Sequence, residues 1–303
     1  MPDALQRLPE GARVAVIRLR SLGDCVLTTP ALDILKRFRP DLEIAIVVED
    51  RFKPVFEDNP AISVVLPPSR SAVRRWRPVL CLNLHGGTRS AVLTAGSLAK
   101  YRAGFAHFRM SQLYNLRIPT AQEILGVDRT VHTAEHLASA IFWLGAPRCE
   151  IPRAQLFAPP RPVDLPYAVI HPFATGPGKS WSTSGFLAVA EHLRNSFNLD
   201  PVFIAGPGDD TSPFARYRCL AGAPLAEVKS LLRGASLFVG NDSGPAHMAA
   251  AFGLPVLVLF GTSNPEIWAP WRTVSRVITA QGPIEAVPAG EVIEALERLR
   301  VAA

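Results

Sequence analysis

The sequence predicts an α/β protein built from two Rossmann-like halves, each with a parallel sheet. Short apolar runs rich in β-branched residues alternate with stretches of helical periodicity in both halves of the chain. Polar, glycine-containing loops follow several of these runs, and a stretch with five prolines at 151–166 separates the two series. We therefore predict domains at 1–155 and 167–303, joined by a proline-rich linker at 156–166.

The N-terminal half begins with a βαβαβ order, which is typical of a parallel sheet with right-handed crossovers. Strands are expected at 14–19, 44–48, 62–66, 79–84 and 103–105. Helices are expected at 25–38, 52–57, 88–100 and 132–144. The stretch 67–78 is basic, and residues 107–130 show no period, so we expect an irregular segment there.

The C-terminal half repeats this rhythm, with strands expected at 167–171, 201–205, 236–239, 255–260 and 274–279. Longer helices are expected at 185–197, 225–232 and 288–300. A short alanine-rich helix is expected to begin at Pro245, with Asp242 or Ser243 as its N-cap, and to end before Gly253. Its first turn offers free backbone N–H groups and a positive dipole end, so it is either an anion site or an ordinary capped helix.

Composition excludes several classes of protein. The 303 residues are 48% hydrophobic, with a mean hydropathy of +0.17, but no apolar run reaches the roughly 18 residues needed to span a bilayer. No apolar signal core precedes the first strand. The four cysteines are scattered and lack metal-binding spacing, so reduced thiols and a cytoplasmic location are expected.

The positive charge is concentrated in the N-terminal half. Residues 1–160 hold 21 Lys and Arg against 14 Asp and Glu, whereas residues 161–303 hold 11 against 12. This excess either serves solubility or favours an acidic partner, such as anionic lipid or a phosphorylated glycan. Nucleic acid is not expected, because no nucleic-acid-binding motif accompanies the charge.

Four loops follow predicted strands, where open parallel sheets bind their ligands: 21–24, 173–179, 206–210 and 241–244. Lys179 ends a glycine-rich loop, but Phe173 stands where a Walker phosphate loop needs glycine. This lysine could neutralise a phosphate or be an ordinary solvated side chain. The loop that starts at Gly206 lacks the third glycine of a dinucleotide fingerprint, so Asp209 and Asp210 either contact a ribose or form a polar turn.

Asp24 has two interpretations as well. Near a helix start an aspartate is usually a cap, yet a carboxylate at the end of a strand could serve as a base for an acceptor hydroxyl. His85 could line the same site or simply satisfy backbone groups, and His171 could merely end its strand. No metal-ligand spacing and no Asp-x-Asp motif occur, and the absence of a GxSxG motif argues against a serine hydrolase.

Four segments, in order, resemble glycosyltransferase family 9, the ADP-heptose:lipopolysaccharide heptosyltransferases. They are VIRLRSLGDCVLTTPALDILKRF, LNLHGGTRSAVLTAGSLAKYRAGF, GKSWSTSGFLAVAEHL and GNDSGPAHMAAAFGLPVLVLFGTSNPEIWAPW. The resemblance implies the GT-B fold, in which two Rossmann-like domains face each other across a cleft. It also implies inverting transfer without a metal or other cofactor, with acceptor bound by the N-terminal domain and nucleotide-sugar by the C-terminal one.

Matched residue by residue, Asp24 corresponds to the catalytic base and Lys179 to the lysine on the donor phosphates. The donor signature falls on Asp242, Ser243, Gly244 and His247, and a nucleotide contact falls near Gly206 and Asp210. The acceptor candidates are Arg70, Arg74, Arg75, Arg77 and His85. Asn83 stands where the family pattern has aspartate.

The resemblance thus implies a glycosyltransferase that moves heptose from ADP-heptose onto a lipopolysaccharide core or a related anionic glycolipid. Such an enzyme would be cytoplasmic, with peripheral contact at the inner membrane surface as an option. Two alternatives stay open from the residues: another GT-B enzyme, such as a nucleotide-sugar 2-epimerase, or a non-catalytic nucleotide-sugar-binding protein. Retention of Asp24, Lys179 and the NDSG loop together argues against the last.

Overall fold

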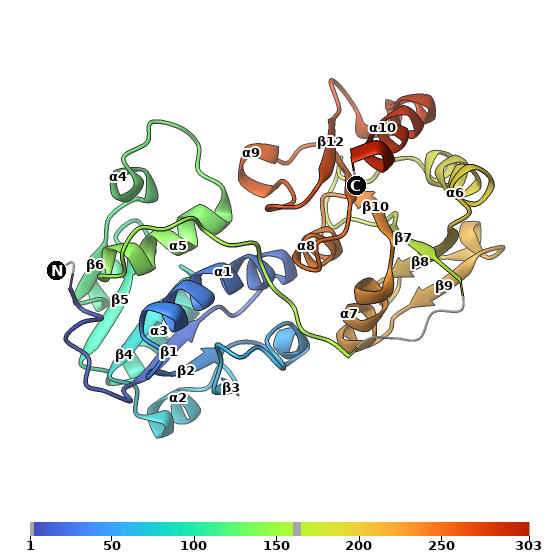
Figure 1. Cartoon of the computed structure of the whole chain (residues 1–303). Helices are drawn as coiled ribbons and strands as arrows, with labels where there is room; N and C mark the ends of the chain where they lie inside the picture. The colour runs from blue at the N-terminus through green and yellow to red at the C-terminus, as the bar shows by residue number, and fades with distance from the viewer. Residues whose placement is uncertain (1–2, 160–164, 303) are drawn as a thin grey trace. The chain divides into compact units, whose positions relative to one another are not determined.

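The computed structural model describes residues 3–159 and 165–302 and divides the chain into two compact units, Met1–Phe157 and Ala158–Ala303. The division falls within the stretch predicted as a linker, of which residues 160–164 lie outside the described residues. Each unit contains one six-stranded sheet, and every strand pair in these sheets is parallel. Figure 1 shows the course of the chain through both units.

The sheet of the first unit has the order β3-β2-β1-β4-β5-β6. Its strands are β1 (Arg13–Ile17), β2 (Glu43–Val47), β3 (Val64–Leu66), β4 (Leu80–Asn83), β5 (Tyr101–Phe105) and β6 (Leu116–Ile118). The central strands are buried on both faces, which explains their unbroken apolar runs.

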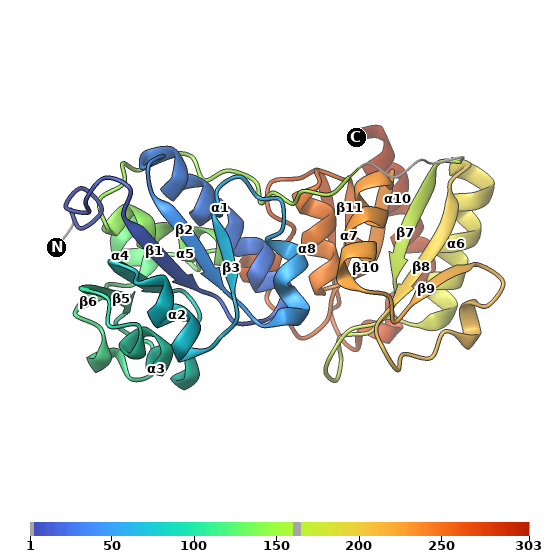
Figure 2. The ribbon, with the colours of Figure 1, turned by 90° about the horizontal axis from the view of Figure 1, so that it is seen from below.

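Helices cover both faces of this sheet, and they are α1 (Leu22–Phe38), α2 (Arg70–Trp76), α3 (Thr88–Gly96), α4 (Ala121–Leu125) and α5 (Thr133–Trp143). Helix α5 packs against α1 and α4, while α2 packs against α3, as Figure 2 shows. Short 3₁₀ turns, η1 (Asp50–Val55) and η2 (Ser111–Leu113), complete the unit. The apolar face of α1, including Leu27, Ile34 and Leu35, is buried as its spacing predicted.

The sheet of the second unit has the order β12-β11-β10-β7-β8-β9. Its strands are β7 (Tyr167–His171), β8 (Asp200–Ala205), β9 (Arg218–Ala221), β10 (Leu237–Asn241), β11 (Val256–Phe260) and β12 (Ser275–Thr279). Read from β9, this is the same order as in the first unit, with β7 and β10 in the places of β1 and β4. In each unit the chain adds strands first on one side of its first strand, β1 or β7, and then on the other side. The switch lies between β1 and β4 in one sheet and between β7 and β10 in the other, and ligands are expected there, beyond the carboxyl ends of these strands.

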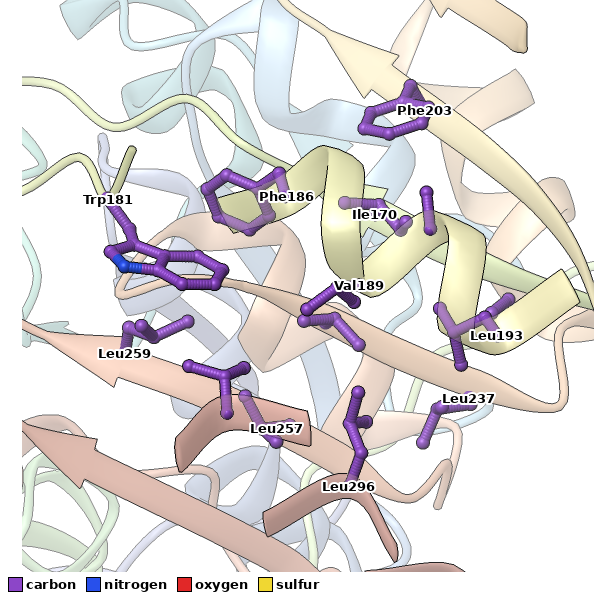
Figure 3. Packing of buried hydrophobic residues seen from close by; sticks show 14 of the residues in the cluster. Ile170, Trp181, Phe186, Val189, Leu193, Phe203, Leu237, Leu257, Leu259 and Leu296 are labelled. Carbon is purple, nitrogen blue, oxygen red and sulfur yellow. The ribbon is translucent and has the colours of Figure 1, made fainter. Parts of the chain in front are cut away.

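The helices of the second unit are α6 (Thr183–Phe197), α7 (Leu225–Gly234), α8 (Gly244–Ala251), α9 (Pro265–Trp268) and α10 (Ala289–Ala302), with 3₁₀ turns η3 (Ser212–Phe214) and η4 (Ile284–Ala286). Its core lies where α6 and α10 meet the sheet. Figure 3 shows Trp181, Phe186 and Val189 in this cluster beside Leu257, Leu259 and Leu296. The indole of Trp181 is fixed there, because its Nε1 donates to the carbonyl of Val287 at 2.9 Å.

Several elements differ from the sequence-based expectations. Residues 107–130 are not irregular, because they contain η2, β6 and α4. Helix α4 has a capping box, in which Thr120 accepts from the Glu123 backbone and Glu123 accepts from the Thr120 backbone. The basic stretch 67–78 forms α2, capped by Ser69, and α1 begins at Leu22 rather than at 25.

Candidate functional site

Asp24 lies in the first turn of α1, directly after the carboxyl end of β1. Its Oδ2 accepts a hydrogen bond from Ser21 Oγ at 2.9 Å, and its Oδ1 lies 3.3 Å from Arg18 Nη1. The Asp24 side chain keeps 22% of its surface exposed, whereas that of Arg18 keeps 7%. The carboxylate is therefore held in one orientation and stays open to a ligand, as a general base requires.

Two histidines, His85 and His136, lie within electrostatic range of this carboxylate. Burial, followed by the charge of Arg18, lowers the pKa of His85, which follows β4. Burial also lowers the pKa of His136 on α5 to about 4, with contributions from His107 and Arg18. Both rings are therefore uncharged at neutral pH. An uncharged imidazole can donate one hydrogen bond and accept another, and it does not compete with the Arg18 guanidinium as a cationic partner of Asp24.

Asn83, the last residue of β4, is fully buried and shapes the loop that carries His85. Its Nδ2 donates to Tyr114 Oη at 2.8 Å and to Ser90 Oγ at 3.0 Å. Its Oδ1 accepts from the backbone of His85 at 2.9 Å and of Gly86 at 3.3 Å. The amide of Asn83 thus both donates and accepts, and it joins the end of β4 to α3 and to Tyr114, the residue after η2.

The structure does not gather the predicted acceptor arginines around Asp24. Arg74, Arg75 and Arg77 are exposed and line a cavity of about 520 Å³ together with Arg13 and Ser71. Arg13 is the first residue of β1, so this cavity lies at the opposite end of that strand from Asp24. Arg70 begins α2, and its side chain lies beside Gly96. Among the predicted acceptor residues, His85 is close enough to Asp24 for the carboxylate to influence its pKa.

In the second unit, the structure brings two predicted donor residues together. Lys179 Nζ lies 3.7 Å from Asp242 Oδ2, and both side chains are partly exposed, at 33% and 12%. Lys179 belongs to the loop after β7, and Asp242 directly follows β10, the neighbouring strand. Since carboxyl ends of parallel strands share one edge of the sheet, the two loops form one site.

Ser243 occupies the N-cap position of α8, which begins at Gly244, but its hydroxyl makes no capping bond. The hydroxyl instead lies 3.0 Å from Nδ1 of His171, the last residue of β7. Burial lowers the pKa of His171 to about 4, so the ring is neutral at neutral pH. Ser243 is therefore the N-cap, as predicted for Asp242 or Ser243, but the helix begins at Gly244 rather than at Pro245, and its first turn receives no hydrogen bond from the Ser243 side chain.

Asn241 was missed by the sequence analysis. It is the last residue of β10 and is fully buried, and its amide joins both ends of the loop that carries Lys179. Its Oδ1 accepts from the backbone of Trp181 at 3.0 Å, and its Nδ2 donates to the carbonyl of Pro172 at 2.8 Å. The signal was present in the sequence as a polar residue that ends an apolar strand, but its partners depend on the fold of the loop.

The same loop rests on Gly261, directly after β11. A Cβ at Gly261 would lie 1.9 Å from the carbonyl oxygen of Gly178, so only glycine permits this approach. His247, on α8, is buried, and its ring lies 6.4 Å from that of Trp268 in an edge-on arrangement. The loops after β7, β10 and β11 thus contact one another beside Lys179 and Asp242.

The loop at Gly206 and Asp210 forms an internally bonded turn. Asp209 accepts from the backbone of Gly206 at 2.7 Å, and Asp210 accepts from the backbone of Ser212 at 2.9 Å. These hydrogen bonds to Ser212 also lower the pKa of Asp210, which is exposed. A nucleotide contact by these residues stays a prediction.

No group of three or more His, Cys, Asp or Glu side chains that could hold a metal ion occurs within 3–159 and 165–302. Within the same ranges no helix combines the length and the apolar character needed to cross a membrane.

Comparison with known proteins identifies the family. The model of glycosyltransferase family 9 (heptosyltransferase) matches residues 71–288, which is most of the chain. The chain belongs to this family. It is therefore a glycosyltransferase, as the sequence predicted.

A curated relative, lipopolysaccharide heptosyltransferase 3 of Escherichia coli, is 26% identical over 299 residues, which cover 84% of each chain. The solved glycosyltransferase family 9 protein of Veillonella parvula superposes with a TM-score of 0.84 at 20% identity, covering 96% of this chain and 98% of that one. The solved E. coli ADP-heptose lipopolysaccharide heptosyltransferase II gives a TM-score of 0.78 at 21% identity, covering 96% and 99%. These likenesses confirm the predicted GT-B fold.

Proposed function

We propose that this glycosyltransferase moves heptose from ADP-heptose to an acceptor of the lipopolysaccharide core, with inversion at the anomeric carbon. The observation that supports this most directly is that Lys179 and Asp242 meet beside the start of α8, where Ser243 makes no side-chain capping bond. Cationic and N–H groups at one point suit a diphosphate. The names of its relatives, which specify lipopolysaccharide and ADP-heptose, support the choice of substrates.

In this proposal Asp24 takes the proton of an acceptor hydroxyl as its oxygen forms a bond to the anomeric carbon. The bond from that carbon to the diphosphate oxygen breaks on the opposite face, and ADP leaves with the bonding electrons. Lys179, the positive N-terminal end of α8 and His247 stabilise the charge that develops on the diphosphate, which needs neither a metal ion nor another cofactor.

The acceptor is an anionic glycolipid in this proposal. His85 contacts the reacting sugar near Asp24, and Arg70, Arg74, Arg75 and Arg77 hold phosphate or carboxylate groups farther along the molecule. Gly206 and Asp210 contact the nucleoside. The enzyme works in the cytoplasm and touches the inner membrane surface peripherally through this basic unit.

The test is transfer by purified protein from ADP-heptose to a heptose-free lipopolysaccharide core, in buffer with EDTA. We expect Asp24→Asn to lower turnover by about two to four powers of ten, the usual range for a lost base, while ADP affinity stays the same. Asp33→Asn is the matched control, because Asp33 lies on the same helix and pairs with Arg37. Near-normal turnover of Asp24→Asn, or transfer that EDTA abolishes and Mg²⁺ restores, would contradict the mechanism.

A further inference from the structure

We propose that Asn241 is a positioning residue that sets the place of Lys179 for the donor diphosphate. The proposal rests on the proposed function for its ligand, but its structural basis is independent of it. The amide of Asn241 bridges Pro172 and Trp181, which stand at the two ends of the loop 173–180. Lys179 is the cation of this loop, and it points back to Asp242, the residue next to Asn241.

The two ends of the loop are held by different contacts, so a change at Asn241 affects one end more than the other. The Trp181 end is also fixed by its indole, which is buried in the core of the second unit and bonded to Val287, as Figure 3 shows for the side chain. The carbonyl of Pro172 accepts the 2.8 Å bond from Asn241 Nδ2. Loss of this donor therefore removes a side-chain tether from the β7 side of the loop, where Pro172 directly follows the strand, while the Trp181 side keeps its bond from the indole.

Asparagine is the residue type that this bridge needs. A backbone N–H requires an acceptor, a backbone carbonyl requires a donor, and the side-chain amide supplies both at one carbon. Asn241 is fully buried, so water does not replace a lost partner at low cost. An aspartate of nearly the same shape would keep the bond from Trp181 but would turn a carboxylate oxygen toward the carbonyl of Pro172.

A second copy of this bonding pattern provides a matched control. In the first unit, Asn115 Oδ1 accepts from the backbone of Arg102 and Asn115 Nδ2 donates to the carbonyl of Lys100, both at 2.7 Å. Asn115 is exposed and lies in the other unit from Lys179. Asn115→Asp thus makes the same chemical change in a similar bridge that carries no predicted donor residue.

The experiment measures ADP affinity by calorimetry for wild type, Asn241→Asp, Lys179→Ala and the double variant. We expect Asn241→Asp to weaken binding by about 10- to 100-fold, the range for one hydrogen bond to a charged group. In the Lys179→Ala background the same change should cost less than about twofold, because Asn241 acts through Lys179. Equal losses in both backgrounds, or wild-type affinity of Asn241→Asp, would overturn the proposal, and Asn115→Asp should bind ADP as wild type does.

Hydrogen exchange without ligand separates this proposal from the proposed function. If the wild-type protein binds no ADP, the donor assignment fails, but the loop can still be judged. We expect amides of 173–180 to exchange about tenfold faster in Asn241→Asp than in wild type, with no change in Asn115→Asp. Unchanged exchange of 173–180 in Asn241→Asp would refute the role of Asn241 whatever the nucleotide result.

Discussion

Acid sensitivity of the second unit should depend on His171. Burial lowers the pKa of this ring from its ordinary 6.5 to about 4, so the unfolded chain takes up a proton more readily than the folded one. The folded state is unaffected above pH 6.5 and loses stability progressively as the pH falls toward 4. With these two pKa values, linkage predicts a loss of about 2 kcal/mol at pH 5 and about 3 kcal/mol at pH 4.

His171→Asn removes this titration while leaving an oxygen near the place of Nδ1, so that Ser243 can keep a partner. Amide exchange of peptides from β7 and β10 reports local unfolding free energy in wild type and variant at the same pH, which cancels the intrinsic rate. Between pH 7 and pH 5, we expect the unfolding free energy of wild type to fall by about 2 kcal/mol more than that of the variant.

His136 supplies the control within the same molecule. Burial lowers its pKa to about 4 as well, but it belongs to the first unit. Peptides of α5 should therefore become less protected at acid pH to the same extent in both proteins. The reasoning would be refuted if the local unfolding free energies of β7 and β10 differed between wild type and His171→Asn by the same amount at every pH.

Two further substitutions examine the donor loops. Lys179→Ala should weaken ADP binding by about 10- to 100-fold in calorimetry, because a charge-assisted bond to phosphate is lost, whereas Lys53→Ala, an exposed lysine of the first unit, should not. If Lys179→Ala binds ADP as tightly as wild type does, Lys179 is an ordinary solvated surface lysine rather than a phosphate ligand. Gly261→Ala should lower the thermal midpoint and weaken ADP binding, because its Cβ would collide with the carbonyl of Gly178 and displace the loop. Gly282→Ala, which would meet no atom within 4 Å, should leave both unchanged, and an equal effect of the two would argue against this close approach.

Hydrophobic periodicity was sufficient to predict the long elements of both sheets. Strands such as β1 and β11 are buried along nearly their whole length, so their apolar runs are unbroken. Short elements were missed where packing, rather than pattern, decides the structure. Helix α4 has five residues and β9 is a four-residue edge strand with no buried position, and neither leaves a periodic signal. The Thr120 and Glu123 capping box and Gly126 would have identified α4.

The candidate site was predictable only in part. That Lys179 and Asp242 meet follows from topology, because the loops after neighbouring parallel strands share an edge. The roles of Asn241 and His171 depend on a few side-chain hydrogen bonds between the residues at and after the ends of β7 and β10, and no sequence spacing encodes these bonds. Charge alone likewise could not show that Arg74, Arg75 and Arg77 lie by the amino end of β1, away from Asp24.

The strand order of the two sheets has a consequence for biosynthesis. Every strand pairing described joins strands of the same unit, and the first unit is complete at residue 157, before any strand of the second begins. A nascent chain can therefore finish the first sheet while the ribosome is still adding the rest, at about 5–20 residues per second. Asp24 would be set in its final surroundings about 1 to 4 seconds before Lys179 leaves the exit tunnel, because 22 residues separate Lys179 from the end of the first unit.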